Sequence, residues 1–185
     1  VHMTFNSKIL SYIFSYQIFF ATVLIGAMSN NASAKNLVYE NNWAYLADTV
    51  MGGVSQGGAE FSAGALRLTG QVSTKNNGGF IQVRTRIDPT AAIGKSGIKI
   101  KVKGNGDIYY LHVRNASARL PWQYYTASFK TSEKWKDISI SFDEFEKSAT
   151  LMPRKLKPDS IKTIGLVAYG KDHEADVSIA NLEFY

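Results

Sequence analysis

The stretch Ile98–Arg114, IKIKVKGNGDIYYLHVR, decides the fold class of this chain. Its first part alternates strictly between apolar residues and lysine, which is typical of a strand with one face on a core and the other in water. The next residues, GNG, predict a turn, and DIYYLHVR predicts the strand that returns from it as a hairpin. One face of the returning strand carries Tyr109, Leu111 and Val113, and the other carries Ile108, Tyr110, His112 and Arg114.

Most of the chain after residue 57 follows the same period of two. Short runs rich in β-branched and aromatic residues are separated by glycine and proline, and the one helical turn expected is at Pro158–Ile161. Regularly spaced short strands predict an all-β protein, an antiparallel sandwich or barrel. The other strands are expected at Glu60–Phe61, Ala65–Val72, Phe80–Ile87, Tyr124–Lys130, Lys136–Phe142, Thr163–Tyr169 and Ala175–Phe184.

Residues 1–34 are expected to be a secretory signal peptide rather than part of the fold. No charge occurs from Ile9 to Met28, and Ala32-Ser33-Ala34 supplies the pattern of small residues that signal peptidase cleaves. An uncleaved anchor is the alternative, since the uncharged run could just span a bilayer, although polar residues interrupt it. Residues 35–185 are then one domain, exported to the periplasm or the extracellular space, with no stable membrane span after cleavage.

The amino-acid composition limits the classes of site and partner that this chain could have. The chain has no cysteine, which excludes disulfides, a bacterial lipid anchor and cysteine-based metal or redox motifs. Residues 35–185 hold 20 basic and 15 acidic residues, and the net charge of +5 weakly favours anionic partners. Because the basic residues form no concentrated stripe in an exported chain, we expect no nucleic acid partner. We also expect no cofactor and no bound metal.

Glycine pairs lie in segments predicted to be loops, in DTVMGGVSQGG (48–58) and NNGGF (76–80). They match neither the Walker loop nor the dinucleotide fingerprint. Glycine lets two backbones approach closely, which predicts two loops crossing at one end of a sandwich. The polar residues beside them form either a brace or a binding site, with the acid paired to the arginine. This predicted cluster comprises Asp48, Ser55, Asn76, Asn77 and Arg84.

Aromatic residues give a second candidate site in PWQYYTASF (121–129). Trp122, Tyr124 and Tyr125 could form an open strip that stacks on sugars or peptides, or they could fill the core. Since neighbours in a strand point to opposite faces, one of Tyr124 and Tyr125 is expected to be exposed or in a groove.

Catalytic residues are not recognisable in this sequence. Beyond residue 34 the histidines are His112, within a strand, and His173, at a predicted solvated hairpin tip. Neither Gly-x-Ser-x-Gly nor His-Glu-x-x-His is present. A small hydrolase that uses Asp48 or an unrecognised pair of acids is the least favoured function, and we expect the protein not to be an enzyme.

Several motifs together resemble the complex I intermediate-associated protein 30 family. They are Trp43, DTVMGGVS (48–55), GQVS (70–73), NNGGF (76–80) with Arg84, and later pieces such as YTASF (125–129). The resemblance covers about residues 43 to 185 and implies a galactose-binding-like jelly-roll sandwich, in agreement with the strand pattern. It also implies a non-catalytic role, because mitochondrial members of the family are assembly chaperones of respiratory complex I. The same fold occurs in carbohydrate-binding modules.

Two functions follow as hypotheses. The first is an exported, non-catalytic module that holds a protein partner in the manner of an assembly factor, through the cluster around Asp48. The alternative is a carbohydrate-binding module of the jelly-roll type, which would use Trp122, Tyr124 and Tyr125 to hold a polysaccharide.

Overall fold

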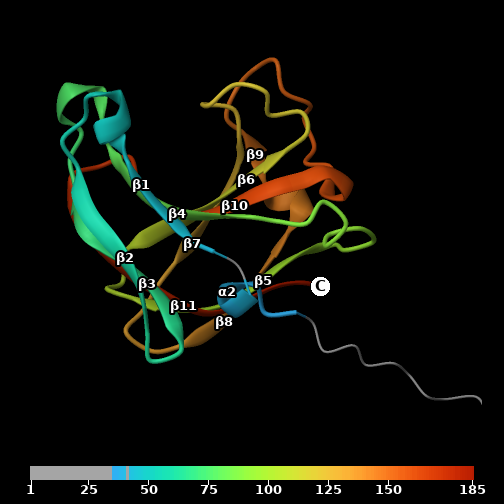
Figure 1. The fold of residues 1–185 in the computed structure, drawn as a ribbon, viewed down its shortest axis with the longest axis horizontal. Helices are drawn as coiled ribbons and strands as arrows, with labels where there is room; N and C mark the ends of the chain where they lie inside the picture. Colours follow the sequence, from blue (N-terminus) through green and yellow to red (C-terminus); the bar gives the residue numbers. More distant parts are fainter. Residues whose placement is uncertain (1–34, 41) are drawn as a thin grey trace, which may run out of the picture. The chain divides into compact units, whose positions relative to one another are not determined.

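The strands form two antiparallel sheets in the computed structural model, which describes residues 35–40 and 42–185 (Figure 1). The six-stranded sheet has the order β1 (Ala44–Ala47), β4 (Phe80–Arg86), β10 (Ile161–Tyr169), β6 (Ile108–Asn115), β7 (Tyr125–Lys130), β9 (Glu146–Lys147). The five-stranded sheet has the order β2 (Gln56–Ser62), β3 (Ala65–Val72), β11 (His173–Phe184), β5 (Gly97–Gly104), β8 (Lys136–Ser141). A short helix, α2 (Leu37–Glu40), precedes β1. The predicted signal peptide lies outside the described residues.

The predicted fold class, an antiparallel jelly-roll sandwich, is confirmed. Strands that follow each other along the chain often belong to different sheets, and every strand pair found among the described residues is antiparallel. The side chains between the sheets form one apolar core. It includes the apolar face of β5, the Tyr109/Leu111/Val113 face of β6 and the centres of β10 and β11.

The predicted hairpin of residues 98–114 was wrong in its pairing, although both strands exist. β5 pairs with β11 and β8 in one sheet, whereas β6 pairs with β10 and β7 in the other. The connection between them is therefore a crossover that brings two apolar faces onto the same core from opposite sides. At its start a Cβ on Gly104 would lie 2.8 Å from both the Asp176 carbonyl oxygen and Thr131 Oγ1, so only glycine fits there.

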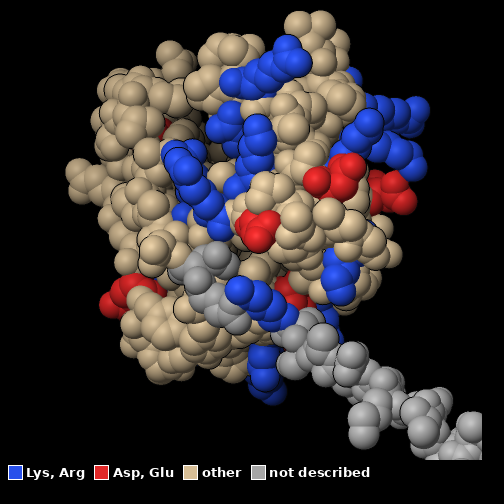
Figure 2. Space-filling view, turned by 45° about the vertical axis from the view of Figure 1, so that its right-hand side comes forward, with Lys and Arg blue, Asp and Glu red and all other residues tan. Residues whose placement is uncertain are grey.

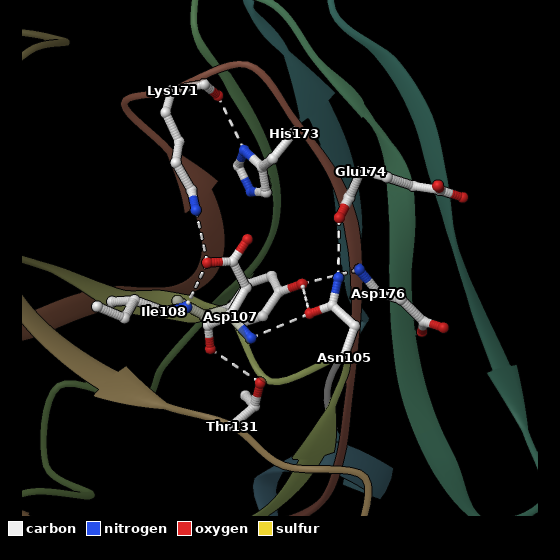
Figure 3. A network of polar contacts seen from close by, with 9 residues as sticks. Asn105, Asp107, Ile108, Thr131, Lys171, His173, Glu174 and Asp176 are labelled. Atoms are coloured by element: carbon white, nitrogen blue, oxygen red, sulfur yellow. Dashed lines mark hydrogen bonds and ion pairs between the residues drawn. The ribbon is translucent and has the colours of Figure 1, made fainter.

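A network of polar contacts fixes this crossover to the turn between β10 and β11 (Figure 3). Asn105 Nδ2 donates to the Glu174 carbonyl oxygen at 2.9 Å, and Lys171 Nζ lies 2.7 Å from Asp107 Oδ1. The buried Tyr109 hydroxyl donates to Asn105 Oδ1 at 2.9 Å and accepts from the Asp176 amide at 2.8 Å. These bonds lock the end of the sandwich where the two sheets exchange strands.

His173, at the start of β11, is half-buried in this network rather than at a solvated tip. Its Nδ1 lies 2.8 Å from the Lys171 carbonyl oxygen. The hydrogen bond from Lys171 is the main reason why the pKa of Asp107 is lowered, and His173 adds a smaller electrostatic contribution. Both residues thus serve the junction between turns.

Removing the Tyr109 hydroxyl should weaken this junction. We expect Tyr109→Phe to lower the free energy of unfolding by about 1–2 kcal/mol, because it leaves the Asp176 amide and the Asn105 oxygen without their partner. Urea unfolding followed by fluorescence would measure the change. Tyr110→Phe, in the same strand but on its outer face, is the control, and an equal loss in both variants would contradict the assignment.

Among the described residues, no helix is long and apolar enough to cross a membrane.

Candidate functional site

The first predicted cluster is built around the Asp48 carboxylate, which is fully buried. Its oxygens accept hydrogen bonds from the Ser55 amide at 3.0 Å, the Ser55 hydroxyl at 2.5 Å, the Gly79 amide at 2.5 Å and the Phe80 amide at 3.2 Å. Burial by itself would raise the pKa of Asp48, but these bonds outweigh it and hold the pKa below its usual value. The carboxylate is therefore charged and satisfied from all sides.

The glycine pairs are explained by this carboxylate. A Cβ on Gly53 would lie 2.4 Å from Asp48 Cγ, and a Cβ on Gly78 would lie 2.4 Å from Asp48 Oδ2. The two loops thus close over the acid from both sides, where any larger residue would collide with it. The Ser55 hydroxyl extends the junction by accepting from the Ser73 amide at 2.9 Å.

The remaining members of the predicted cluster form no hydrogen bond with the Asp48 carboxylate. Asn76 and Asn77 are exposed, with φ values of 59° and 58°, a left-handed conformation that asparagine tolerates. Asn76 Nδ2 donates to the Gly52 carbonyl oxygen at 3.3 Å. The expected pairing of Asp48 with Arg84 is corrected, because amides and a hydroxyl satisfy the acid and Arg84 lines a hollow elsewhere. We call Asp48 with its donors the loop brace.

The predicted aromatic strip is also divided by the structure. Tyr125 is fully buried, and its hydroxyl donates to the Pro153 carbonyl oxygen at 2.9 Å, so it is a core residue and its assignment to a binding strip is corrected. Trp122 lies in the loop before β7, with 63% of its surface exposed. Tyr124 is only partly buried and points to the opposite side from Tyr125.

A second site emerges on the outer face of the six-stranded sheet, the face turned away from the core. Its floor is the central strand β10, where Gly165 pairs with Arg84 and His112, and Thr163 pairs with Arg86 and Arg114. Thr163 and Gly165 thus lie between longer side chains of both flanking strands, and we call this strip of the sheet face the trough. Gly165 itself is buried, and a Cβ added to it would stand 3.2 Å from Gln82 Oε1 and 3.5 Å from Arg84 Cβ.

Four rings gather at one end of this trough, and we call them the aromatic cluster: Tyr110, His112, Tyr124 and Tyr169. His112 and Tyr124 stack with centroids 4.0 Å apart, and Tyr169 meets Tyr110 edge-on at 5.9 Å. Burial raises the pKa of Tyr124, with smaller electrostatic and hydrogen-bond contributions from Tyr169. Burial also lowers the pKa of His112 to about 4, so its ring is neutral near pH 7. Tyr169 is 45% exposed and presents a ring to solvent.

Positive charge gathers at the other end, in a hollow of about 1070 Å³ that we call the basic hollow. Its cations are Arg84, Arg86, Arg114 and Lys162, and the described residues that line it include no Asp or Glu. Burial lowers the pKa of Arg114, and the nearby charge of Arg84 lowers it further. Figure 2 shows Lys and Arg side chains grouped on the face that it displays, with few acidic ones between them.

Sequence reasoning missed most of this site. The period of two placed Tyr110, His112 and Arg114 together on one face of a strand, and this was the available signal. Tyr169, Arg84 and Arg86 come beside them because β10 pairs with β6 on one side and with β4 on the other, which no local pattern reveals. The described residues include no cluster of acidic or histidine side chains that could hold a metal ion.

The two antiparallel sheets define a class of protein, the jelly-roll β-sandwich domains. Within that class, the sequence model of "Complex I intermediate-associated protein 30" matches residues 32–179, and the chain belongs to this family. No curated protein matches the chain by sequence at a significant level.

Solved structures with the same fold include sugar-binding domains. The family 11 carbohydrate-binding module of the cellulase Lic26A-Cel5E from Clostridium thermocellum is 16% identical, with a TM-score of 0.66 over 82% of this chain and 93% of that one. The family 11 module from the same organism in complex with a β-1,3-1,4-mixed-linked tetrasaccharide is 15% identical, with a TM-score of 0.64 over 77% and 88%. An exo-β-agarase has a TM-score of 0.53 at 12% identity, over 81% of this chain and 24% of its own. At these identities the comparisons establish the fold.

Proposed function

We propose that the protein is an exported, non-catalytic module that binds a polysaccharide on the outer face of its six-stranded sheet. The observation that carries this proposal is the aromatic cluster on this sheet face, at one end of the strip in which Gly165 and Thr163 lie between longer side chains. Exposed rings beside polar groups are the usual means of holding sugars, since the apolar face of a pyranose stacks on them. Export is inferred from the leader pattern of residues 1–34.

The solved relatives support the proposal through their fold. A family 11 module of the same architecture is known in complex with a mixed-linked tetrasaccharide. Function does not follow from fold alone, so the proposal depends on the side chains that this chain places on its sheet face.

Removing an exposed ring should weaken polysaccharide binding. We expect Tyr169→Ala to reduce the affinity of residues 35–185 for the bound polysaccharide by about tenfold or more, because the stacking surface is lost. Affinity electrophoresis against neutral and acidic polysaccharides, followed by calorimetry on those that retard the protein, would measure it. Phe61→Ala is the matched control, since Phe61 is 53% exposed but lies in the five-stranded sheet. Mobility unchanged by every polysaccharide would overturn the proposal.

A protein partner is the second candidate function, and one observation favours it. The loop that follows Asp48 in the loop brace exposes apolar side chains to solvent, with Val50 65% and Met51 68% exposed. Exposed apolar residues gathered in one loop are typical of docking surfaces. A Val50→Ser/Met51→Ser variant that keeps its stability but loses a crosslinked partner in the native host would support this function, and identical crosslinks in both proteins would remove it.

A further inference from the structure

We propose that the polysaccharide bound on this face is acidic, and that the basic hollow holds the carboxylate or sulfate groups of its sugars. The inference rests on the proposed glycan-binding function and adds the charge class of the ligand. It comes from the cations at one end of the trough rather than from the rings at the other.

Among the described residues, no carboxylate forms an ion pair with the cations of the basic hollow. The ion pairs found elsewhere in the described part of the chain use Arg67, Lys155 and Lys171. The cations of the hollow form none with the described residues, and the lining contributes no carboxylate. Like charges held this close repel one another, so an anion that enters the hollow relieves repulsion as well as making new bonds.

Arg114 still has hydrogen-bonding capacity. Its Nη2 donates to the carbonyl oxygens of Ala118 at 3.2 Å and Leu120 at 2.9 Å, which fixes the guanidinium in place. Its buried Nε has no hydrogen-bond partner among the described residues. A planar guanidinium with its position fixed and donors to spare is suited to a carboxylate or sulfate oxygen.

The spacing of the two ends fits one chain of sugars. Across the sheet, Arg86 and Arg114 flank Thr163 in one row, so their Cα atoms stand about 10 Å apart on strands separated by about 5 Å. The next row, with Gly165 between Arg84 and His112, lies about 7 Å further along the strands. A ligand lying in the trough can therefore stack one sugar on the aromatic cluster while the acidic group of a neighbouring sugar reaches the hollow.

Other ligands fit these features less well. A neutral glycan would stack on the rings of the aromatic cluster. It would also desolvate the arginines without giving them a charged partner, which costs binding energy. A nucleic acid would satisfy the arginines, yet it usually binds along an extended basic track, whereas these cations form a single pocket. Both alternatives are included as outcomes of the test.

The test compares charged and uncharged forms of one polymer on residues 35–185. Calorimetry would be run with polygalacturonate and its carboxyl-reduced form, and with a sulfated galactan and agarose. The variant is Arg84→Gln/Arg86→Gln, two exposed residues whose removal leaves the fixed Arg114 in place. The matched control is Lys99→Gln/Lys101→Gln, which removes the same charge from the five-stranded sheet. A single-stranded oligonucleotide is included at the same ionic strength.

We expect at least one acidic polymer to bind about tenfold or more tightly than its uncharged form, with the difference abolished by Arg84→Gln/Arg86→Gln and kept by the control. The preferred polymer distinguishes carboxylate from sulfate. Equal binding of both forms, unaffected by the arginine variant, would overturn this inference and leave the proposed function standing. An equal loss in the lysine control, or tighter arginine-dependent binding of the oligonucleotide, would also overturn it. If no polymer binds, the proposed function itself fails.

Discussion

Asp48→Ala should cost about 4 kcal/mol of unfolding free energy, the largest effect expected of a single substitution in this domain. The change leaves buried amides of Ser55, Gly79 and Phe80 without their acceptor and opens a void between the two loops. Asp48→Asn should be almost as costly, because its amide group would turn a donor toward donors. Urea unfolding of residues 35–185 at pH 7 would measure both.

The control for this prediction is Asp143→Ala. Asp143 is exposed and its ion pair with Lys155 is open to water, so we expect no measurable change in stability. A folded Asp48→Ala protein with wild-type stability would contradict the loop brace. If that protein also lost its ligand, the original alternative of a binding site at Asp48 would be restored.

The loop brace shows how far the sequence could be interpreted. The combination of an acid with two glycine pairs correctly suggested two loops crossing at close range, because few other arrangements need glycine on both sides of a carboxylate. The partner of the acid could not be predicted, since three backbone amides and one hydroxyl take the place of a charged residue only when the chain around them is already folded. Arg84 was assigned because a buried acid needs a charged or multiply hydrogen-bonded partner, but its register in β4 turns it to the outer face.

The outer face of the six-stranded sheet shows more clearly what could not be predicted from the sequence. Alternation in β5 and β6 correctly separated core residues from outward ones, and so fold class followed from local pattern. The pairing of the strands could not be predicted in this way, because a strand with one apolar face can join either sheet of a sandwich and still cover the same core. His112 and Tyr169 come within reach of each other only because β10 lies beside β6, and that neighbourhood depends on the whole topology.

Because His112 is buried, we expect the free energy of unfolding to fall in mild acid. The folded pKa of about 4 lies below the usual value of 6.5, so the unfolded chain binds more protons between these values. Protonation of His112 therefore does not reduce the free energy of unfolding above about pH 6.5, and it reduces this free energy progressively as the pH falls toward 4. Between pH 7 and pH 5 the expected loss is about 2 kcal/mol.

The neighbours of His112 offer no means of keeping an imidazolium stable. Tyr110, Tyr124 and Tyr169 pack around its ring, and the nearest charged side chains in its register, Arg84 and Arg114, are cations. The lowered pKa of Asp48 contributes stability that is lost only below its usual pKa near 4, so measurements at pH 7, 6 and 5 isolate the histidine. Urea unfolding of His112→Gln should show a much flatter dependence on pH than the wild type. A wild-type slope in that variant would show that another group carries the acid sensitivity, and that the ring stacked on Tyr124 is not held neutral by burial.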